Sequence, residues 1–156
     1  MSGNNKYGGA AAVGTNVYFA PSGMGNVGML DTTTSTFTTI DTEAAGISGY
    51  SKYAFHYDGA VALGGKVYFA PYVQDGIGVV DAASSTFSTI DVAAAGITGS
   101  NKYGGAPAVL GTTVYFAPNT QDNVGVLALP APPSPPPITD SGCVICSRSA
   151  SRLPKA

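Results

Sequence analysis

The sequence predicts an all-β fold assembled from repeated four-stranded units. Three observations predict it: a pentapeptide that recurs along the chain, a shortage of charged helix-forming residues, and Gly-, Asn-, Asp-, Ser- and Thr-rich segments between short apolar runs. Only 10% of the 156 residues are charged, against roughly 25% in an average soluble domain. This composition excludes a coiled coil, a long solvated helix and a charged disordered chain.

The internal repeat is the strongest of these signals. The pentapeptide VYFAP recurs at intervals of 50 and 47 residues, at 17–21, 67–71 and 114–118. The segments downstream also match one another, as in NVGMLD, GIGVVD and NVGVL, and as in STFTTID and STFSTID. A Lys-Tyr pair precedes each copy. The repeat therefore predicts three units, of about residues 6–51, 52–101 and 102–129.

Each full unit is expected to contain four short strands. In the first unit they are predicted at 9–13, 16–20, 27–30 and 36–40, and the third unit is expected to begin with a strand at 105–110. The first strand is poor in large side chains, as a strand near a crowded centre would be. The second concentrates β-branched and aromatic residues and ends at a proline, which cannot donate to the ladder.

Four short strands in just under 50 residues match the length of a β-propeller blade. The third unit lacks its fourth strand, because residues 130–137 (PAPPSPPP) cannot pair in a ladder. We therefore predict β-propeller-like blades of four antiparallel strands within residues 1–129, with two full blades and a partial third. A ring takes about 4 to 8 blades. The chain could be a fragment, could share a ring or stack with other chains, or could form an open array.

The repeat resembles the YVTN-type β-propeller family over about residues 6–129. That family's pattern of Tyr-Val-Thr-Asn, then Val-x-Val-Ile-Asp, a Thr/Asn-rich turn and Val-x-x-Ile is similar to residues 17–40 here, although Phe-Ala-Pro replaces Val-Thr-Asn. The blade organisation is also similar to kelch-like repeats. Such families include surface-layer proteins, carbohydrate-related proteins and lactonase-like enzymes. The resemblance therefore implies a fold without naming one activity.

The second unit carries what reads as a four-residue insertion, at 53–59. Its aromatic residues could stack on sugar rings or pack over the blade: Tyr53, Phe55 and Tyr57. His56, the only histidine, could pair with Asp58 for catalysis, but an ordinary loop histidine is the interpretation we favour. The Lys-Tyr pairs either present a periodic binding rim or mark the entry to each unit: Lys6, Tyr7, Lys52, Tyr53, Lys102 and Tyr103.

Aspartates recur at the ends of the predicted strands, at Asp31, Asp41, Asp81 and Asp91. Recurring acids can ligate hard cations, which need several oxygen ligands. A carboxylate that accepts a backbone N–H of its own turn is commoner, and we expect that role here. No metal and no cofactor is predicted.

Residues 138–156 are predicted to be a flexible basic tail containing Cys143 and Cys146 in a CxxC pattern. These cysteines could form a local disulfide or stay free, whereas a zinc site would need a second pair, from another chain. Residues 130–137 are expected to be a polyproline II linker, a stiff spacer or a ligand for proline-binding domains. They also resemble the Ser-Pro-Pro-Pro modules of extensin-type cell-wall proteins, which implies hydroxylation and O-glycosylation at Pro132, Pro133, Ser134, Pro135, Pro136 and Pro137.

These features favour a non-enzymatic structural or binding module of an extracellular or surface protein, which self-associates through exposed blade faces or edges. Its partners would be other copies or a carbohydrate. A fragment of a lactonase- or lyase-like propeller enzyme and an intracellular protein-interaction propeller are the alternatives. A net charge of −2 offers no basic face for nucleic acid, and no apolar run reaches the roughly 20 residues of a membrane span. The N-terminus lacks a signal-peptide core, so an extracellular location is expected only if the chain is a fragment without its signal peptide.

Overall fold

The structure is a computed structural model and describes residues 5–47 and 55–131. The predictions for Lys52, Tyr53, Pro132, Pro133, Ser134, Pro135, Pro136, Pro137, Cys143 and Cys146 lie outside these residues. Within the described ranges the chain is all-β, as predicted, and its strands form antiparallel sheets.

Two four-stranded sheets are built by consecutive strands. The first contains β1 (Tyr7–Val13), β2 (Asn16–Pro21), β3 (Asn26–Asp31) and β4 (Thr36–Asp41) in that order. The second contains β5 (Tyr57–Leu63), β6 (Lys66–Pro71), β7 (Gly76–Asp81) and β8 (Thr86–Asp91). Val17 lies opposite Leu30 in the first sheet as Val67 lies opposite Val80 in the second. The four strands predicted for each full unit are therefore confirmed.

The third sheet has three strands, β9 (Ala108–Leu110), β10 (Thr113–Phe116) and β11 (Gly125–Ala128). The described residues end at 131, three positions after β11, so the prediction that the third unit lacks a fourth strand stays a prediction. The first strand is shorter than the expected 105–110. Pro107 has no N–H to donate, and Gly105 has a φ of 71°, outside the extended region, so pairing begins only at Ala108.

Two short 3-10 helices, which the sequence analysis did not predict, follow the outer strands. They are η1 (Glu43–Ala45) and η2 (Ala93–Ala95). Each ends at a glycine in the left-handed region, Gly46 at φ 77° and Gly96 at φ 75°. The carboxylate before each helix accepts its first N–H, with Asp41 Oδ1 2.9 Å from Glu43 N and Asp91 Oδ1 2.8 Å from Ala93 N.

The hairpin turns confirm the structural role expected for the other recurring aspartates. Asp31 Oδ1 accepts the N–H of Thr33 at 2.8 Å, and Asp81 Oδ1 accepts the N–H of Ala83 at 3.0 Å. These turn hydrogen bonds lower the pKa of the Asp31 carboxyl, and the Lys66 side chain together with the turn lowers the pKa of Asp81.

The strand register corrects one equivalence inferred from the repeat. Tyr7 lies opposite Pro21 in the first sheet, Tyr57 lies opposite Pro71 in the second, and Tyr103 bridges to Pro118 in the third. The counterpart of Lys6-Tyr7 is therefore His56-Tyr57 and not Lys52-Tyr53. The four-residue insertion predicted within 53–59 therefore lies before β5. Tyr57 is the first residue of that strand and not part of a loop.

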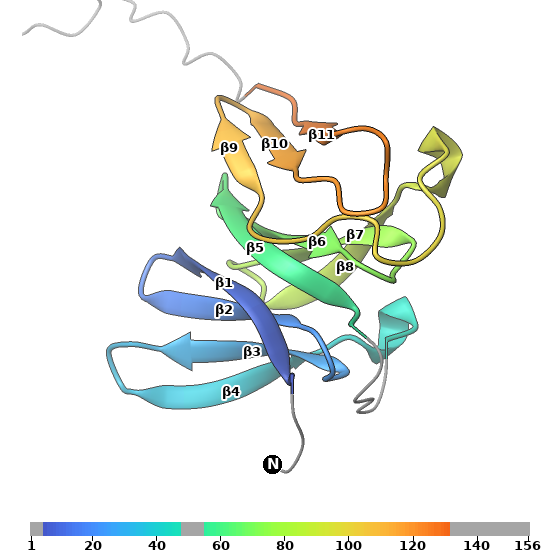
Figure 1. Cartoon of the computed structure of the whole chain (residues 1–156). Helices are drawn as coiled ribbons and strands as arrows, with labels where there is room; N and C mark the ends of the chain where they lie inside the picture. Colours follow the sequence, from blue (N-terminus) through green and yellow to red (C-terminus); the bar gives the residue numbers. More distant parts are fainter. Residues whose placement is uncertain (1–4, 48–54, 132–156) are drawn as a thin grey trace, which may run out of the picture.

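The three sheets stack face to face, in chain order from the bottom to the top of Figure 1. We call the forward face of a sheet the side that carries Tyr18, Tyr68 or Tyr115, and the rear face the opposite side. The forward face of the first sheet packs on the rear face of the second, where Tyr18 and Val27 share a core with Tyr57, Val67, Phe69 and Val80. The forward face of the second packs in the same way on the rear face of the third, where the core contains Tyr68, Ile77, Val79, Tyr103, Val114 and Phe116.

Glycines let the first strands of consecutive units approach closely. A Cβ at Gly9 would lie 3.0 Å from the Cα of Gly59, and a Cβ at Gly59 would overlap with the carbonyl of Gly105. Side chains at these positions would push the sheets apart. The close approach gives a physical reason why the first strand of each unit is poor in large side chains.

Candidate functional site

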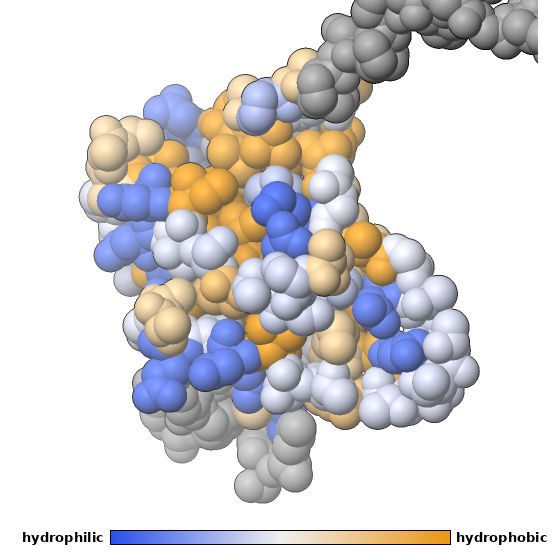
Figure 2. Space-filling model, turned by 180° about the vertical axis from the view of Figure 1, so that it is seen from behind, coloured by the Kyte–Doolittle hydropathy of each residue, from blue (hydrophilic) through white to orange (hydrophobic). Residues whose placement is uncertain are grey.

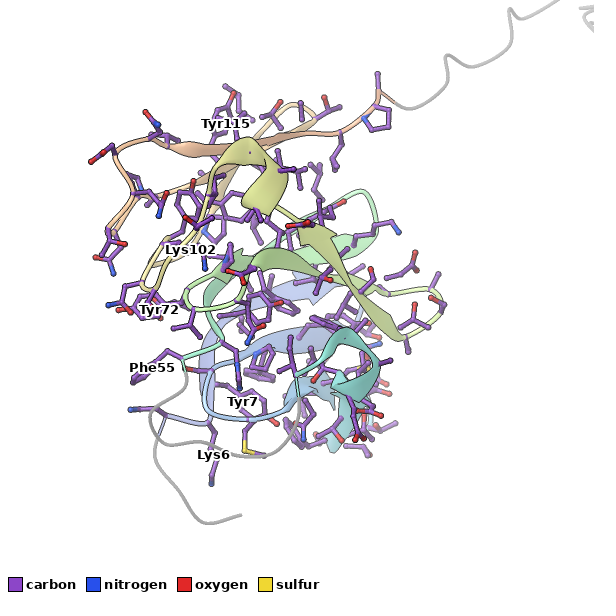
Figure 3. All side chains as sticks on the ribbon, turned by 90° about the vertical axis from the view of Figure 1, so that its right-hand side faces the viewer. Lys6, Tyr7, Phe55, Tyr72, Lys102 and Tyr115 are labelled. Carbon is purple, nitrogen blue, oxygen red and sulfur yellow. The ribbon has the colours of Figure 1, made fainter. Side chains whose placement is uncertain are left out.

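A chain of backbone hydrogen bonds links the three units where each begins. In each link the backbone N–H of one residue donates to the backbone carbonyl of another, at 2.9–3.1 Å. The links run from Ser22 to Lys6, from His56 to Ser22, from Tyr72 to His56, from Lys102 to Tyr72 and from Asn119 to Lys102. We call these six residues the entry chain. Figure 3 shows Lys6, Tyr72 and Lys102 on one side of the stack, together with Phe55. The structure thus places the predicted Lys6, His56 and Lys102 on one line that joins the sheets.

Lys102 is embedded in the contact between the second and third sheets. Its side chain is 0% exposed, and its Nζ donates to the carbonyls of Val73 at 3.1 Å and Gln74 at 3.0 Å. The carboxylate of Asp75, itself largely exposed, lies 3.1 Å from the same nitrogen. Lys102 therefore binds a loop of the preceding unit and presents no cation to an external ligand.

His56 is also buried, and its Nδ1 lies 2.7 Å from Nε2 of Gln74. The Gln74 amide nitrogen is a donor, so the Nδ1 of a neutral His56 accepts. Burial lowers the pKa of His56, which favours this neutral form. Asp58, the residue considered as its catalytic partner, instead accepts the N–H of Gly105 in the third unit at 2.8 Å.

The aromatic residues predicted to bind sugars separate into buried and exposed members. Tyr57 is fully buried against Phe69 and Phe87, and this burial raises the pKa of its hydroxyl. Tyr103, predicted with Lys102 to belong to a binding rim or to mark the entry to its unit, is buried as well, and burial likewise raises its pKa. Neither ring is accessible to a ligand. The hydroxyls of Tyr57 and Tyr18 have no hydrogen-bond partner in the described part of the chain, whereas Tyr7 donates to Asn26 Oδ1 at 2.9 Å.

Phe55 lies at the surface and packs edge-on against Tyr72, with ring centroids 6.0 Å apart. The amide Nδ2 of Asn119 donates to the Tyr72 hydroxyl at 3.3 Å. Sequence reasoning missed Tyr72 and Asn119. The signal that could have found them is their position, because Ser22, Tyr72 and Asn119 each follow the proline of VYFAP.

Among residues 5–47 and 55–131, two apolar faces are left uncovered, one at each end of the stack. On the forward face of the third sheet, Val124 is 54% and Val126 is 61% exposed, whereas their counterparts Ile77 and Val79 are each 5% exposed under the next sheet. Leu110 on the same face is 73% exposed. Figure 2 shows hydrophobic residues gathered over this upper part of the molecule.

The rear face of the first sheet is the other uncovered face. Tyr7, Val17, Phe19 and Leu30 are only half-buried and Phe37 is 43% exposed. The corresponding Tyr57, Val67, Phe69 and Val80 of the second sheet are fully buried. The difference follows from the stacking, because nothing in the described chain packs on this face.

A cavity lies between each pair of consecutive sheets, at corresponding places. The larger, of about 440 Å³, is lined by Leu63, Gly64, Lys66, Tyr68, Thr112, Leu129 and Pro130. The smaller, of about 370 Å³, is lined by Val13, Gly14, Thr15, Asn16, Tyr18, Gly65, Ala82 and Ala83. The one charged group in these linings is Lys66, which is already paired with Asp81 at 2.8 Å. Both cavities are therefore mainly features of the sheet packing.

No group of three His, Cys, Asp or Glu side chains that could hold a metal occurs within residues 5–47 and 55–131. In the same residues, no helix is long and apolar enough to span a membrane. The chain matches no known family model and no curated protein at a significant level of similarity.

Proposed function

We propose that this chain is a non-enzymatic, β-propeller-like structural or binding module of an extracellular or surface protein, and that it associates with copies of itself. The uncovered apolar face at each end of the stack is the observation that carries the proposal. Large exposed apolar patches mark interaction surfaces in soluble proteins.

Several features of the stack support propeller-like blades. Each full sheet is a meander of four antiparallel strands, and consecutive first strands approach through glycine. The entry chain repeats one hydrogen-bond pattern from sheet to sheet. A closed ring takes about 4 to 8 blades, so the described sheets supply part of one.

The surface composition supports an extracellular or surface setting. The outer strands β4 and β8 expose mainly Ser and Thr, and the chain has few charges. The resemblance of residues 130–137 to extensin-type modules points the same way.

The environment of His56 favours a non-enzymatic module over a lactonase- or lyase-like enzyme. The Gln74 side chain is hydrogen-bonded to its imidazole, and the Asp58 carboxylate accepts the N–H of Gly105 and does not pair with His56. A general base needs a hydrogen-bond path to its substrate.

Sedimentation velocity of the full chain, over two orders of magnitude in concentration, tests the association. The expected result is a mass that exceeds the 15.6 kDa of one chain and rises with concentration. A constant mass of one chain would contradict the proposal.

Carbohydrate binding is a second candidate function, favoured by the exposed Phe55 ring beside Tyr72 and Asn119. An aromatic ring offers an apolar face for a sugar ring, and a nearby amide can hydrogen-bond to its hydroxyls. Titration with soluble cell-wall oligosaccharides, followed by NMR, should shift the Phe55 and Tyr72 signals. Phe55→Ala should abolish the shifts, whereas Phe37→Ala, at another exposed phenylalanine, should leave them. Equal shifts in both variants would reject this site.

A further inference from the structure

We propose that the forward face of the third sheet of one copy packs on the rear face of the first sheet of a second copy, head to tail. This inference rests on the proposed self-association and specifies which surfaces meet. The occupant of each uncovered face is thus a second copy of this chain.

The two sheet-to-sheet contacts inside the chain provide the first argument. Both place a forward face on a rear face: Tyr18 and Val27 lie in a core with Phe69, and Tyr68 and Val79 lie in a core with Phe116. The uncovered forward face has the same kinds of residue at the same register positions. Tyr115 takes the place of Tyr68, Val124 of Ile77 and Val126 of Val79.

The rear face of the first sheet provides the second argument, because its surface is already built. Tyr7, Phe19 and Phe37 form a cluster of rings with centroids 6.0–6.2 Å apart. In the second sheet the same positions hold Tyr57, Phe69 and Phe87, at 5.9–6.4 Å. Gly28 and Gly78 leave room beneath these two clusters. The ring cluster of the first sheet faces solvent, whereas the ring cluster of the second sheet is covered by the forward face of the first sheet.

The entry chain provides a third argument. The carbonyls of Ser22 and Tyr72 each accept an N–H from the following unit. Asn119 holds the corresponding position in the third unit, and no backbone N–H of the described residues donates to its carbonyl. A further unit packed on the third sheet would supply that donor.

A forward-on-rear contact joins two different surfaces and is therefore heterologous. Each copy keeps one face of each kind, so the assembly either closes into a ring or grows as an open array. Two copies would bring six sheets together, within the range of about 4 to 8 blades in closed propellers. A forward-on-forward contact has no counterpart inside the chain.

The test uses one arginine on each face of the full chain. Val126→Arg places a charge on the forward face and Phe37→Arg on the rear face, both at positions that are already exposed. Each variant alone should be monomeric, with an apparent dissociation constant raised at least tenfold. An equimolar mixture should form a 1:1 complex, because one variant keeps an intact rear face and the other an intact forward face. Ala94→Arg, on the exposed η2 helix, should associate like the unmodified chain.

Three outcomes separate this inference from the proposed function. Association retained by only one of the two variants would show that copies pair through like faces, and association retained by both would show pairing elsewhere, such as at a strand edge. Either result overturns the head-to-tail contact while self-association stands. A monomeric unmodified chain overturns both. Circular dichroism checks folding, and Leu110→Arg with Thr39→Arg, at exposed positions on the same two faces, repeats the test if either first variant misfolds.

Discussion

The buried ammonium of Lys102 contacts two kinds of group, backbone carbonyls and a carboxylate, which contribute differently to stability. Two backbone carbonyls, those of Val73 and Gln74, accept from it, and only one carboxylate, that of Asp75, is paired with it. A buried polar group left without a partner costs about 1–3 kcal/mol. The Asp75 carboxylate is 76% exposed, so water screens the ion pair from one side. The carbonyl contacts should therefore dominate.

Replacing Lys102 with methionine should lower the free energy of unfolding by about 1–3 kcal/mol, because two loop carbonyls lose their donor. Asp75→Asn should lower it by less, because the asparagine amide oxygen can still accept from Nζ and both carbonyl contacts remain. Urea denaturation of both variants measures the difference. Equal losses would show that the ion pair, and not the carbonyl contacts, holds the loop.

Stability should depend on pH through His56. Burial lowers its pKa below the ordinary 6.5, so the unfolded chain takes up a proton more readily than the folded one. The free energy of unfolding should then be constant above about pH 7.5 and should fall as the pH drops through 6.5. The pKa values of Asp31 and Asp81 are lowered below 3.8, so their contributions are lost only at much more acidic pH.

Denaturant unfolding at about pH 7.5 and 5.5 checks this expectation. Since His56 is the only histidine, His56→Gln should flatten the profile across that window. A profile that keeps its slope in the variant would assign the dependence to another group.

At the scale of elements, the segments that begin each unit, β1, β5 and the residues before β9, form the contact line between units. Gly9, Gly59 and Gly105 lie where consecutive backbones meet. Hydrogen bonds within each sheet hold its strands together, but the spacing between sheets depends on these glycines. A single methyl group added at the contact line should therefore disturb the packing of the sheets and lower the stability of the whole stack.

Gly59→Ala should destabilise the chain by about 1–3 kcal/mol or more, because the new Cβ would overlap with the Gly105 carbonyl. Gly104→Ala is the matched control, since its Cβ would come no closer than 3.4 Å to any neighbour and should cost less than about 0.5 kcal/mol. Guanidinium titration compares the two. Similar stabilities of the two variants would show that the sheets can separate without loss.

Strand positions could be predicted because their signals are local. β-branched and aromatic runs, turn residues and the closing proline all lie within a few residues of the strand they define. The equivalence of the unit entries was assigned to the wrong residues, because Lys52-Tyr53 repeats the letters of Lys6-Tyr7. The ladder places Tyr57 opposite Pro71, and the sequence does carry a signal for it, since Tyr7 and Tyr57 both lie ten residues before the VYFAP pentapeptide.

The candidate site depended still more on distant contacts. The burial of Lys102 is set by carbonyls of another unit, and the Tyr72–Asn119 contact joins two units as well. Residue type alone therefore suggested a charged binding rim, whereas in the structure Lys102 is a buried contact between two units. Phe55 was singled out because aromatic residues gather in its segment, but its packing against Tyr72 is again a contact with residues distant in the sequence.

At the scale of the whole molecule, each sheet packs only on its neighbours, as in other stacked repeats. In the part of the chain that the structure describes, the two end sheets therefore lack the cover that the middle sheet has. Covering them in an assembly would add stability to the folded state only.

The midpoint of thermal unfolding should accordingly rise with protein concentration, because association selects the folded chain. Val126→Arg should remove this dependence without lowering the midpoint measured for the dilute chain. Differential scanning calorimetry at several concentrations measures both. A midpoint of the unmodified chain that is independent of concentration would contradict the expectation.

The hydroxyl of Tyr57, which finds no hydrogen-bond partner among the described residues, has a consequence for protein engineering. In the first sheet Asn26 accepts from Tyr7, but Gly76 stands at the corresponding position and offers no side-chain acceptor. An acceptor cannot easily be built there, since a Cβ at Gly76 would lie 3.1 Å from the carbonyl oxygen of Ile90. Tyr57→Phe keeps the ring that fills the core and removes only the atom without a partner. This position is therefore one starting point for a more stable form of the chain.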